Sequence, residues 1–145
     1  MRYALDLGPD AFGGEEADIA LSPDGHRIVF PVRSPDGKAQ LATRLLDQPQ
    51  AALLPGTEGG NQPFFSPDSQ WVAFFTGGAL SKISVLGGAP VVLANTTANA
   101  TGGSWDQGGI TTALSHATSL SLIPADGEQY ALVHVEKIAA GNVLA

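Results

Sequence analysis

Short apolar runs with a period of two recur along this chain, and each of them ends at glycine or proline. In the stretch 61–94, one such run alternates between two faces: Trp71, Ala73 and Phe75 on one, Gln70, Val72 and Phe74 on the other. A strand repeats every two residues and a helix every 3.6, so these runs predict β-strands. No stretch predicts a long amphipathic helix. We therefore expect an all-β chain.

One unit of this pattern occurs twice at a constant spacing. Residues 20–30 match residues 64–74, so that Leu21, Ser22, Ile28 and Phe30 each stand 44 positions before Phe65, Ser66, Val72 and Phe74. A third, degenerate copy follows Ser104, with Trp105 at the position of Phe65. A period in the forties with several strands per repeat is typical of β-propeller blades. The sequence predicts blades of four antiparallel strands, with about three blades per chain, which makes a half-propeller.

The repeats divide one predicted propeller domain, residues 1–145, into four parts. Residues 1–16 are expected to form an N-terminal closing strand and a linker. The predicted strands of blade 1, residues 17–60, are 17–21, 26–32, 39–46 and 51–54. Those of blade 2, residues 61–98, are 62–65, 70–75, 79–85 and 90–94. Those of the degenerate blade 3 and its tail, residues 99–145, are 102–105, 110–115, 119–124 and 129–135.

The turn Ser22-Pro23-Asp24-Gly25 has a clear physical basis. Proline presets φ at the second position, aspartate hydrogen-bonds its own backbone, and glycine accepts a positive φ. The second copy has Ser69 in place of the glycine, and we expect this residue to hold the same conformation at some strain.

These residues carry a family resemblance. Ser-Pro-Asp-Gly, followed by polar, aliphatic and phenylalanine positions, resembles the repeat of TolB-type, WD-repeat-like bacterial propellers. The segments 54–68 and 87–93 are similar to blades found after bacterial Ser/Thr kinase domains. The resemblance covers roughly residues 19–126 and departs from the family pattern at Ser69 and at 106–109, where Asp-Gln-Gly-Gly replaces the proline-aspartate turn. It implies a β-propeller whose relatives are often periplasmic, tethered to a neighbouring domain or placed beside peptidase domains.

Three blades are too few for a closed ring, because propellers close with four to eight blades. An open arc would leave apolar sheet faces exposed, which marks an interface. Two arcs related by a two-fold axis would give a six-bladed ring, and residues 1–7 could then cross over as a lock. The alternative is a fragment whose remaining blades lie on a longer chain. A competing detail is that residues 129–135 already supply an outer strand to blade 3, which would leave the N-terminal strand no place to fill.

The amino-acid composition limits the classes of partner that the chain is expected to bind. A formal net charge of −7, with seven Lys and Arg in no cluster, argues against nucleic acid and acidic lipid surfaces. There are no cysteines, so no disulfide or cysteine metal site is expected. No apolar run approaches the length of a membrane span, and residues 1–10 lack a signal-peptide core. As given, the sequence predicts a cytoplasmic protein. A periplasmic location is expected instead if the chain is excised from a longer one.

The sequence signals for catalytic and metal-binding residues are weak. Ser104, Asp106 and His116 could be read as a hydrolase set, but no nucleophile elbow surrounds the serine. The histidines, His26, His116 and His134, lack metal-ligand spacing. The turn aspartates, Asp24, Asp36 and Asp68, lack the alternation of a calcium loop. We expect no catalytic, cofactor or metal site.

Other features have a simple structural interpretation. We assign Trp71, Phe74 and Phe75 to the core rather than to a ligand platform, because neighbouring blades cover both faces of their strand. The acidic residues Glu15, Glu16 and Asp18 are expected on a solvated face, and the glycosylation-type triplets at Asn95 and Asn99 are expected by chance. The sequence thus predicts a non-enzymatic interaction or scaffold module that self-associates to complete a ring and binds a protein or small ligand at its channel. The alternatives are a sensor or gating fragment of a larger kinase- or peptidase-linked protein, and a half-propeller whose only property is assembly.

Overall fold

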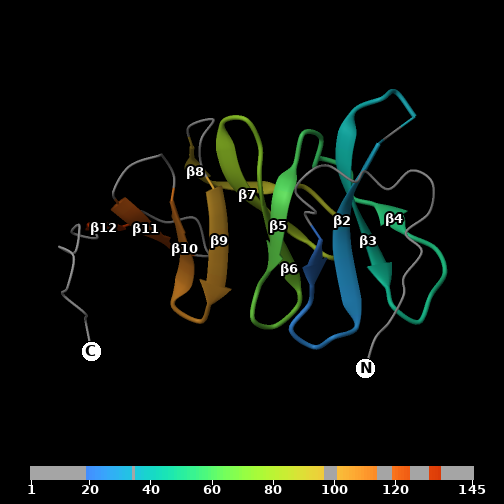
Figure 1. Cartoon of the computed structure of the whole chain (residues 1–145), viewed down its shortest axis with the longest axis horizontal. Coiled ribbons are helices and arrows are strands. Elements are labelled where there is room, and N and C mark those ends of the chain that lie inside the picture. Colours follow the sequence, from blue (N-terminus) through green and yellow to red (C-terminus); the bar gives the residue numbers. More distant parts are fainter. Residues whose placement is uncertain (1–18, 34, 97–100, 114–118, 125–130, 135–145) are drawn as a thin grey trace, which may run out of the picture.

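The structure is a computed structural model, and it describes residues 19–33, 35–96, 101–113, 119–124 and 131–134. All of the elements in these ranges are β-strands, arranged in three antiparallel sheets of four. Figure 1 shows the three sheets side by side in chain order. Each sheet is one propeller blade, so the all-β class and the three blades predicted from the sequence are confirmed.

The strands follow the chain in order within each blade. Blade 1 contains β1 (Ala20–Leu21), β2 (Arg27–Arg33), β3 (Ala39–Leu45) and β4 (Ala52–Leu53). Blade 2 contains β5 (Asn61–Phe65), β6 (Trp71–Phe75), β7 (Ala79–Ser84) and β8 (Val91–Asn95). Blade 3 contains β9 (Thr101–Asp106), β10 (Gly109–Ala113), β11 (Ser119–Ile123) and β12 (Ala131–His134).

Wherever the predicted strand ends fall on described residues, they agree with the observed ends to within one residue. The closing strand and linker, residues 1–16, and the tail after His134 lie outside the described residues. The predicted role of Met1–Leu7 as a lock therefore stays a prediction.

The strand register places the third copy of the repeat. Leu21 pairs with Ile28 in blade 1, Phe65 with Val72 in blade 2, and Trp105 with Ile110 in blade 3. Antiparallel pairing fixes which side chains share a face. Leu21, Phe65 and Trp105 are therefore equivalent positions, as the sequence predicts.

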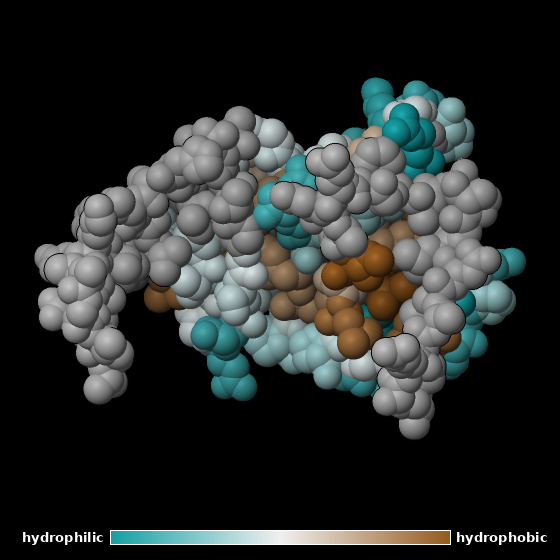
Figure 2. Space-filling model, viewed as in Figure 1, coloured by the Kyte–Doolittle hydropathy of each residue, from teal (hydrophilic) through white to brown (hydrophobic). Residues whose placement is uncertain are grey.

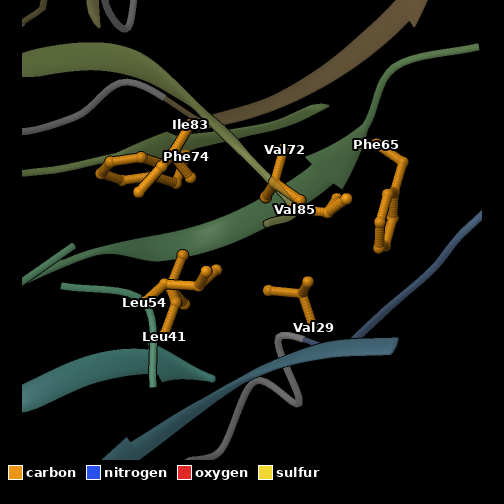
Figure 3. Close-up of a cluster of buried hydrophobic side chains, with 8 residues drawn as sticks. All are labelled: Val29, Leu41, Leu54, Phe65, Val72, Phe74, Ile83 and Val85. Atoms are coloured by element: carbon orange, nitrogen blue, oxygen red, sulfur yellow. The ribbon is translucent and has the colours of Figure 1, made fainter. Parts of the chain in front are cut away.

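Blades 1 and 2 pack through a continuous apolar cluster. Figure 3 shows Val29, Leu41 and Leu54 of blade 1 facing a larger group from blade 2: Phe65, Val72, Phe74, Ile83 and Val85. Every member is buried. Burying large apolar side chains between sheets is the main source of stability in such a fold, at about 1.5–3 kcal/mol for each fully buried side chain.

The strand β6 serves two interfaces, because successive residues point to opposite faces. Val72 and Phe74 pack toward blade 1, whereas Ala73 and Phe75 belong to a second cluster. That cluster reaches blade 3 through Ile110 and Ile123, both with no exposed surface. Blade 2 is thus covered on both faces, which explains why all four residues 72–75 are apolar.

The innermost strands of neighbouring blades approach one another: β1 contacts β5, and β5 contacts β9. One close approach involves Gly103 on β9, where an added Cβ would lie 2.4 Å from Cζ of Phe64 on β5. The same phenylalanine ring is tilted against Phe75, with ring centroids 6.2 Å apart. Within the ranges that the structure describes, no helix is long and apolar enough to cross a lipid bilayer.

Candidate functional site

The turn between β5 and β6 is a rigid hydrogen-bonded unit. The carboxylate oxygen Oδ1 of Asp68 accepts hydrogen bonds from the Ser66 hydroxyl at 2.5 Å and from the backbone N–H of Gln70 at 3.0 Å. The Ser66 hydroxyl oxygen in turn accepts the N–H of Trp71 at 2.9 Å. This network closes the turn and fixes the position from which Trp71 enters β6.

Blade 1 repeats this network. Asp24 Oδ1 accepts from the Ser22 hydroxyl at 2.6 Å and from the His26 N–H at 3.0 Å. Gly25 has φ of 76°, and Ser69 in blade 2 has φ of 63°. The predicted capping role of the aspartates is confirmed. Ser69 holds the predicted left-handed conformation, which is costly for a residue with a Cβ.

These hydrogen bonds favour the ionised carboxylates. Donation by the Ser66 hydroxyl, followed by the Gln70 N–H, lowers the pKa of Asp68 below its ordinary value. Donation by the Ser22 hydroxyl and the His26 N–H lowers the pKa of Asp24 in the same way. Both turns therefore carry a full negative charge at neutral pH.

The corresponding turn of blade 3 is shorter. Phe65 and Val72 are paired across seven positions, whereas Trp105 and Ile110 are paired across five. The blade 3 turn is closed by the pairing of Gly109 with Asp106, and the N–H of Gly108 donates to Asp106 Oδ1 at 2.7 Å. Between the two residues that close each turn, blade 2 has four residues, 67–70, and blade 3 has two, 107 and 108.

The shorter turn matters because Ser69, in the longer turn of blade 2, makes a contact between blades. Its hydroxyl oxygen accepts the backbone N–H of Asp24 at 3.2 Å, which joins the turn of blade 2 to the turn of blade 1. Among the described residues, the shorter turn of blade 3 makes no hydrogen bond to the turn of blade 2. The two turns instead stand apart and enclose a pocket.

This pocket, which we call the interblade pocket, has a volume of about 600 Å³ and opens to solvent. One wall is the turn of blade 2 with two side chains of β6 and β7, and the other is the start of the blade 3 turn. Its lining residues are Ser66, Pro67, Asp68, Trp71, Lys82, Trp105, Asp106 and Gln107. Aromatic surface combined with a few polar groups is typical of ligand sites.

Trp71 and Lys82 form a pair at the base of one wall. The ammonium nitrogen Nζ of Lys82 lies 4.6 Å from the centroid of the Trp71 ring, which is the geometry of a cation–π interaction. By register, the same two positions in blade 1 hold Arg27 and Thr43, joined by a hydrogen bond of 2.9 Å from Nη1 to the hydroxyl. Blade 2 thus places an aromatic face where blade 1 has a guanidinium group.

Solved structures match this arrangement of blades. The putative TolB from Agrobacterium tumefaciens matches over 78% of this chain and 47% of its own, with a TM-score of 0.62 and 17% identity. The β-propeller domain of the Trilobed protease from Pyrococcus furiosus matches over 79% of this chain and 40% of its own, with a TM-score of 0.61 and 12% identity. The fold is that of a TolB-like β-propeller.

The Pyrococcus horikoshii acylaminoacyl peptidase matches over 80% of this chain and 25% of its own, with a TM-score of 0.57 and 8% identity. No family model and no curated protein matches the sequence. The chain spans less than half the length of these three solved structures. At these identities the likeness concerns the TolB-like fold alone.

The core prediction is confirmed for Phe74 and Phe75, which are almost fully buried, and it is wrong for Trp71. Trp71 is only half-buried and lines the interblade pocket. Its strand is covered on both faces, but the indole lies at the start of β6, beside the shortened blade 3 turn, and part of its surface stays exposed.

Of the three hydrolase candidates, the structure describes Ser104 and Asp106. Ser104 is an exposed residue of β9, and the carboxylate of Asp106 caps its own turn. His116 lies outside the described residues, as do the side chain of His134, residues Glu15, Glu16 and Asp18, and Asn99. His26 is exposed at the first turn, and Asn95 is exposed at the end of β8. Among the described side chains, no three His, Cys, Asp or Glu are grouped as metal ligands.

Sequence reasoning missed the pocket as a whole, including Lys82 and Gln107. One signal was available: the third copy places Trp105 at the inner position while its turn is two residues shorter. A large side chain beside a shortened turn indicates a gap between blades.

Proposed function

We propose that the chain is a non-enzymatic propeller scaffold that self-associates to complete a ring, with two copies supplying six blades. The observation that carries this proposal is the unequal burial of equivalent positions. Phe65 is 7% exposed because blade 1 covers it, whereas Leu21, at the same position of blade 1, is 59% exposed. The outer face of blade 1 therefore exposes an apolar position that another blade would bury.

Further positions at both ends of the arc support this reasoning. Ile19 is 52% exposed, whereas Pro63, 44 positions later, is buried. At the other end, Thr111 of blade 3 is half-buried, whereas its equivalent Ala73 has no exposed surface. Figure 2 shows hydrophobic surface over the region of β1 and β2. Blade 3 of a second copy is the natural cover, since a blade is what covers Phe65 within the chain.

The match to solved propellers is in keeping with this proposal, because the chain spans 47% and 40% of the two propeller structures with the highest TM-scores given above. Closed rings remove exposed sheet faces and edges. A C2 dimer made from two arcs would contain two copies of one new interface.

The test is the mass in solution. Light scattering after size-exclusion chromatography should give twice 14.8 kDa, stable on dilution. Leu21→Asp should shift the protein to a monomer, because it places a charge in the new interface. Leu86→Asp is the matched control, since Leu86 is 84% exposed in the turn after β7, away from that face. A wild-type monomer at all concentrations would refute the two-copy ring.

A second candidate is a sensor or gating part of a larger kinase- or peptidase-linked protein. One of the matched solved structures is the propeller domain of a protease, and another is a peptidase. These matches favour the second candidate. The reading frame of the gene decides between the two: a frame that continues into further blades or a catalytic domain would support this candidate.

A further inference from the structure

We propose that the interblade pocket binds the guanidinium group of an arginine side chain presented by a partner peptide. The proposal is independent of ring closure, because both walls of the pocket belong to one chain. It rests on three features of the lining: the aromatic faces, the carboxylates and the internal lysine.

The aromatic faces are concentrated here. The chain has two tryptophans, Trp71 and Trp105, and both line the pocket. Each indole is half-buried, so part of its surface faces the opening. Indole faces attract cations, and guanidinium groups stack on them more often than ammonium groups do. The two side chains come from neighbouring blades, so a cation in the pocket can contact an indole on either side.

The carboxylates give the pocket its charge. Within the described residues, every hydrogen bond to the carboxylates of Asp68 and Asp106 goes to Oδ1. The second oxygen of each group accepts none of these hydrogen bonds. Carboxylate oxygens beside an aromatic face match a guanidinium group, whose N–H donors lie in one plane and whose faces stack.

Lys82 shows that this wall already holds a cation. Its ammonium nitrogen lies 4.6 Å from the centroid of the Trp71 ring. Two carboxylates against one lysine give the lining a net negative charge, which disfavours an anionic ligand. Lys82 is therefore an internal competitor for the Trp71 face, and an arriving guanidinium group displaces it.

The shape of the pocket favours a side chain of a larger molecule. A volume of about 600 Å³ exceeds what one guanidinium group fills, and the pocket opens to solvent instead of enclosing its occupant. The remaining space accommodates the aliphatic stem and the flanking backbone of a peptide, which Gln107 at the rim can meet with its amide.

Intrinsic fluorescence reads this site directly, because both tryptophans of the chain lie in it. We would titrate the full chain with N-acetyl-arginine amide and, separately, with N-acetyl-citrulline amide, which has nearly the same shape and no charge. The arginine compound should give a saturable change in the millimolar range, the order expected of a single side chain. The citrulline compound should bind about tenfold more weakly. Equal responses to both compounds, or no saturable response to arginine, would overturn the proposal.

Two variants separate the roles of the lining residues. Lys82→Met removes the internal competitor but keeps the length of the side chain, and should strengthen arginine binding about threefold. Asp68→Asn should weaken it by roughly three- to tenfold. Asp24→Asn is the matched control, because it alters the same turn in blade 1, outside the pocket, and should leave binding unchanged.

Weaker binding of the arginine compound by Lys82→Met would show that Lys82 does not compete with it for the Trp71 face and would refute the proposal, as would equal effects of Asp68→Asn and Asp24→Asn. The mass of each sample is measured alongside. A monomer that binds arginine would refute ring closure alone, and a dimer that does not bind it would refute the pocket proposal alone.

Discussion

The two interfaces between blades are built from the same repeat and differ in one place. Between blades 1 and 2, the apolar cluster continues to the turns, where Ser69 accepts the N–H of Asp24 and Phe65 is buried. Between blades 2 and 3, the sheets pack through Ile110 and Ile123, but the turns stand apart around the interblade pocket. A repeat can thus open a site by losing two turn residues while its strand register and core persist.

The largest change in stability that tests this comparison is expected from two adjacent residues of β6. Phe74 faces blade 1 and Phe75 faces blade 3, and both are almost fully buried. Replacing either with alanine should cost about 3–5 kcal/mol of unfolding free energy at its own interface. We expect Phe75→Ala to loosen blade 3 selectively, because the turns of blades 2 and 3 stand apart around the interblade pocket, and Phe74→Ala to loosen blades 1 and 2 together.

Amide hydrogen exchange measures the difference. In Phe75→Ala, exchange should accelerate in β9–β11 far more than in β2 and β3, since local opening exposes only the weaker unit. In Phe74→Ala, β2, β3, β6 and β7 should all lose protection. Equal acceleration across all three sheets in both variants would show that the two interfaces are energetically alike.

Much of this fold was predictable because short, local sequence patterns determine its strands and turns. Alternating apolar residues and the Ser-Pro-Asp turns determine strands to within one residue, and a constant spacing aligns Leu21 with Phe65. The pocket was not predictable in the same way. Whether Trp71 is covered depends on a turn some thirty-five positions later in the chain, and no periodicity in β6 carries that information. Trp71 therefore looks like a core residue in the sequence although it lies at an opening.

A smaller effect on stability is expected at the close approach of β9 to the Phe64 ring of β5. Gly103→Ala would place a Cβ 2.4 Å from Cζ of Phe64, a ring that also packs against Phe75. Relief requires the ring or β9 to shift, so we expect a loss of about 1–3 kcal/mol in chemical denaturation. Gly77→Ala is the matched control, because nothing lies within 4 Å of its added Cβ. Equal stability of the two variants would show that the approach of β5 and β9 does not constrain blade 3.

The smallest effect on stability is expected at Ser69, whose hydroxyl joins the turns of blades 1 and 2. Ser69→Gly and Ser69→Ala both remove the hydroxyl that accepts the N–H of Asp24. Glycine relieves the strain of φ 63°, whereas alanine keeps it, so the alanine variant should be less stable by about 1 kcal/mol.

Comparison with the wild-type protein then isolates the contact between turns. Ser69→Ala changes the hydroxyl but not the strain, and it should cost about 0.5–1.5 kcal/mol relative to serine. Gly25→Ala is the control for strain alone, since Gly25 has φ of 76° and open space around an added Cβ. If Ser69→Ala matches the wild type in thermal unfolding, the turn contact contributes nothing, and the opening between blades 2 and 3 has to be attributed to the shortened turn by itself.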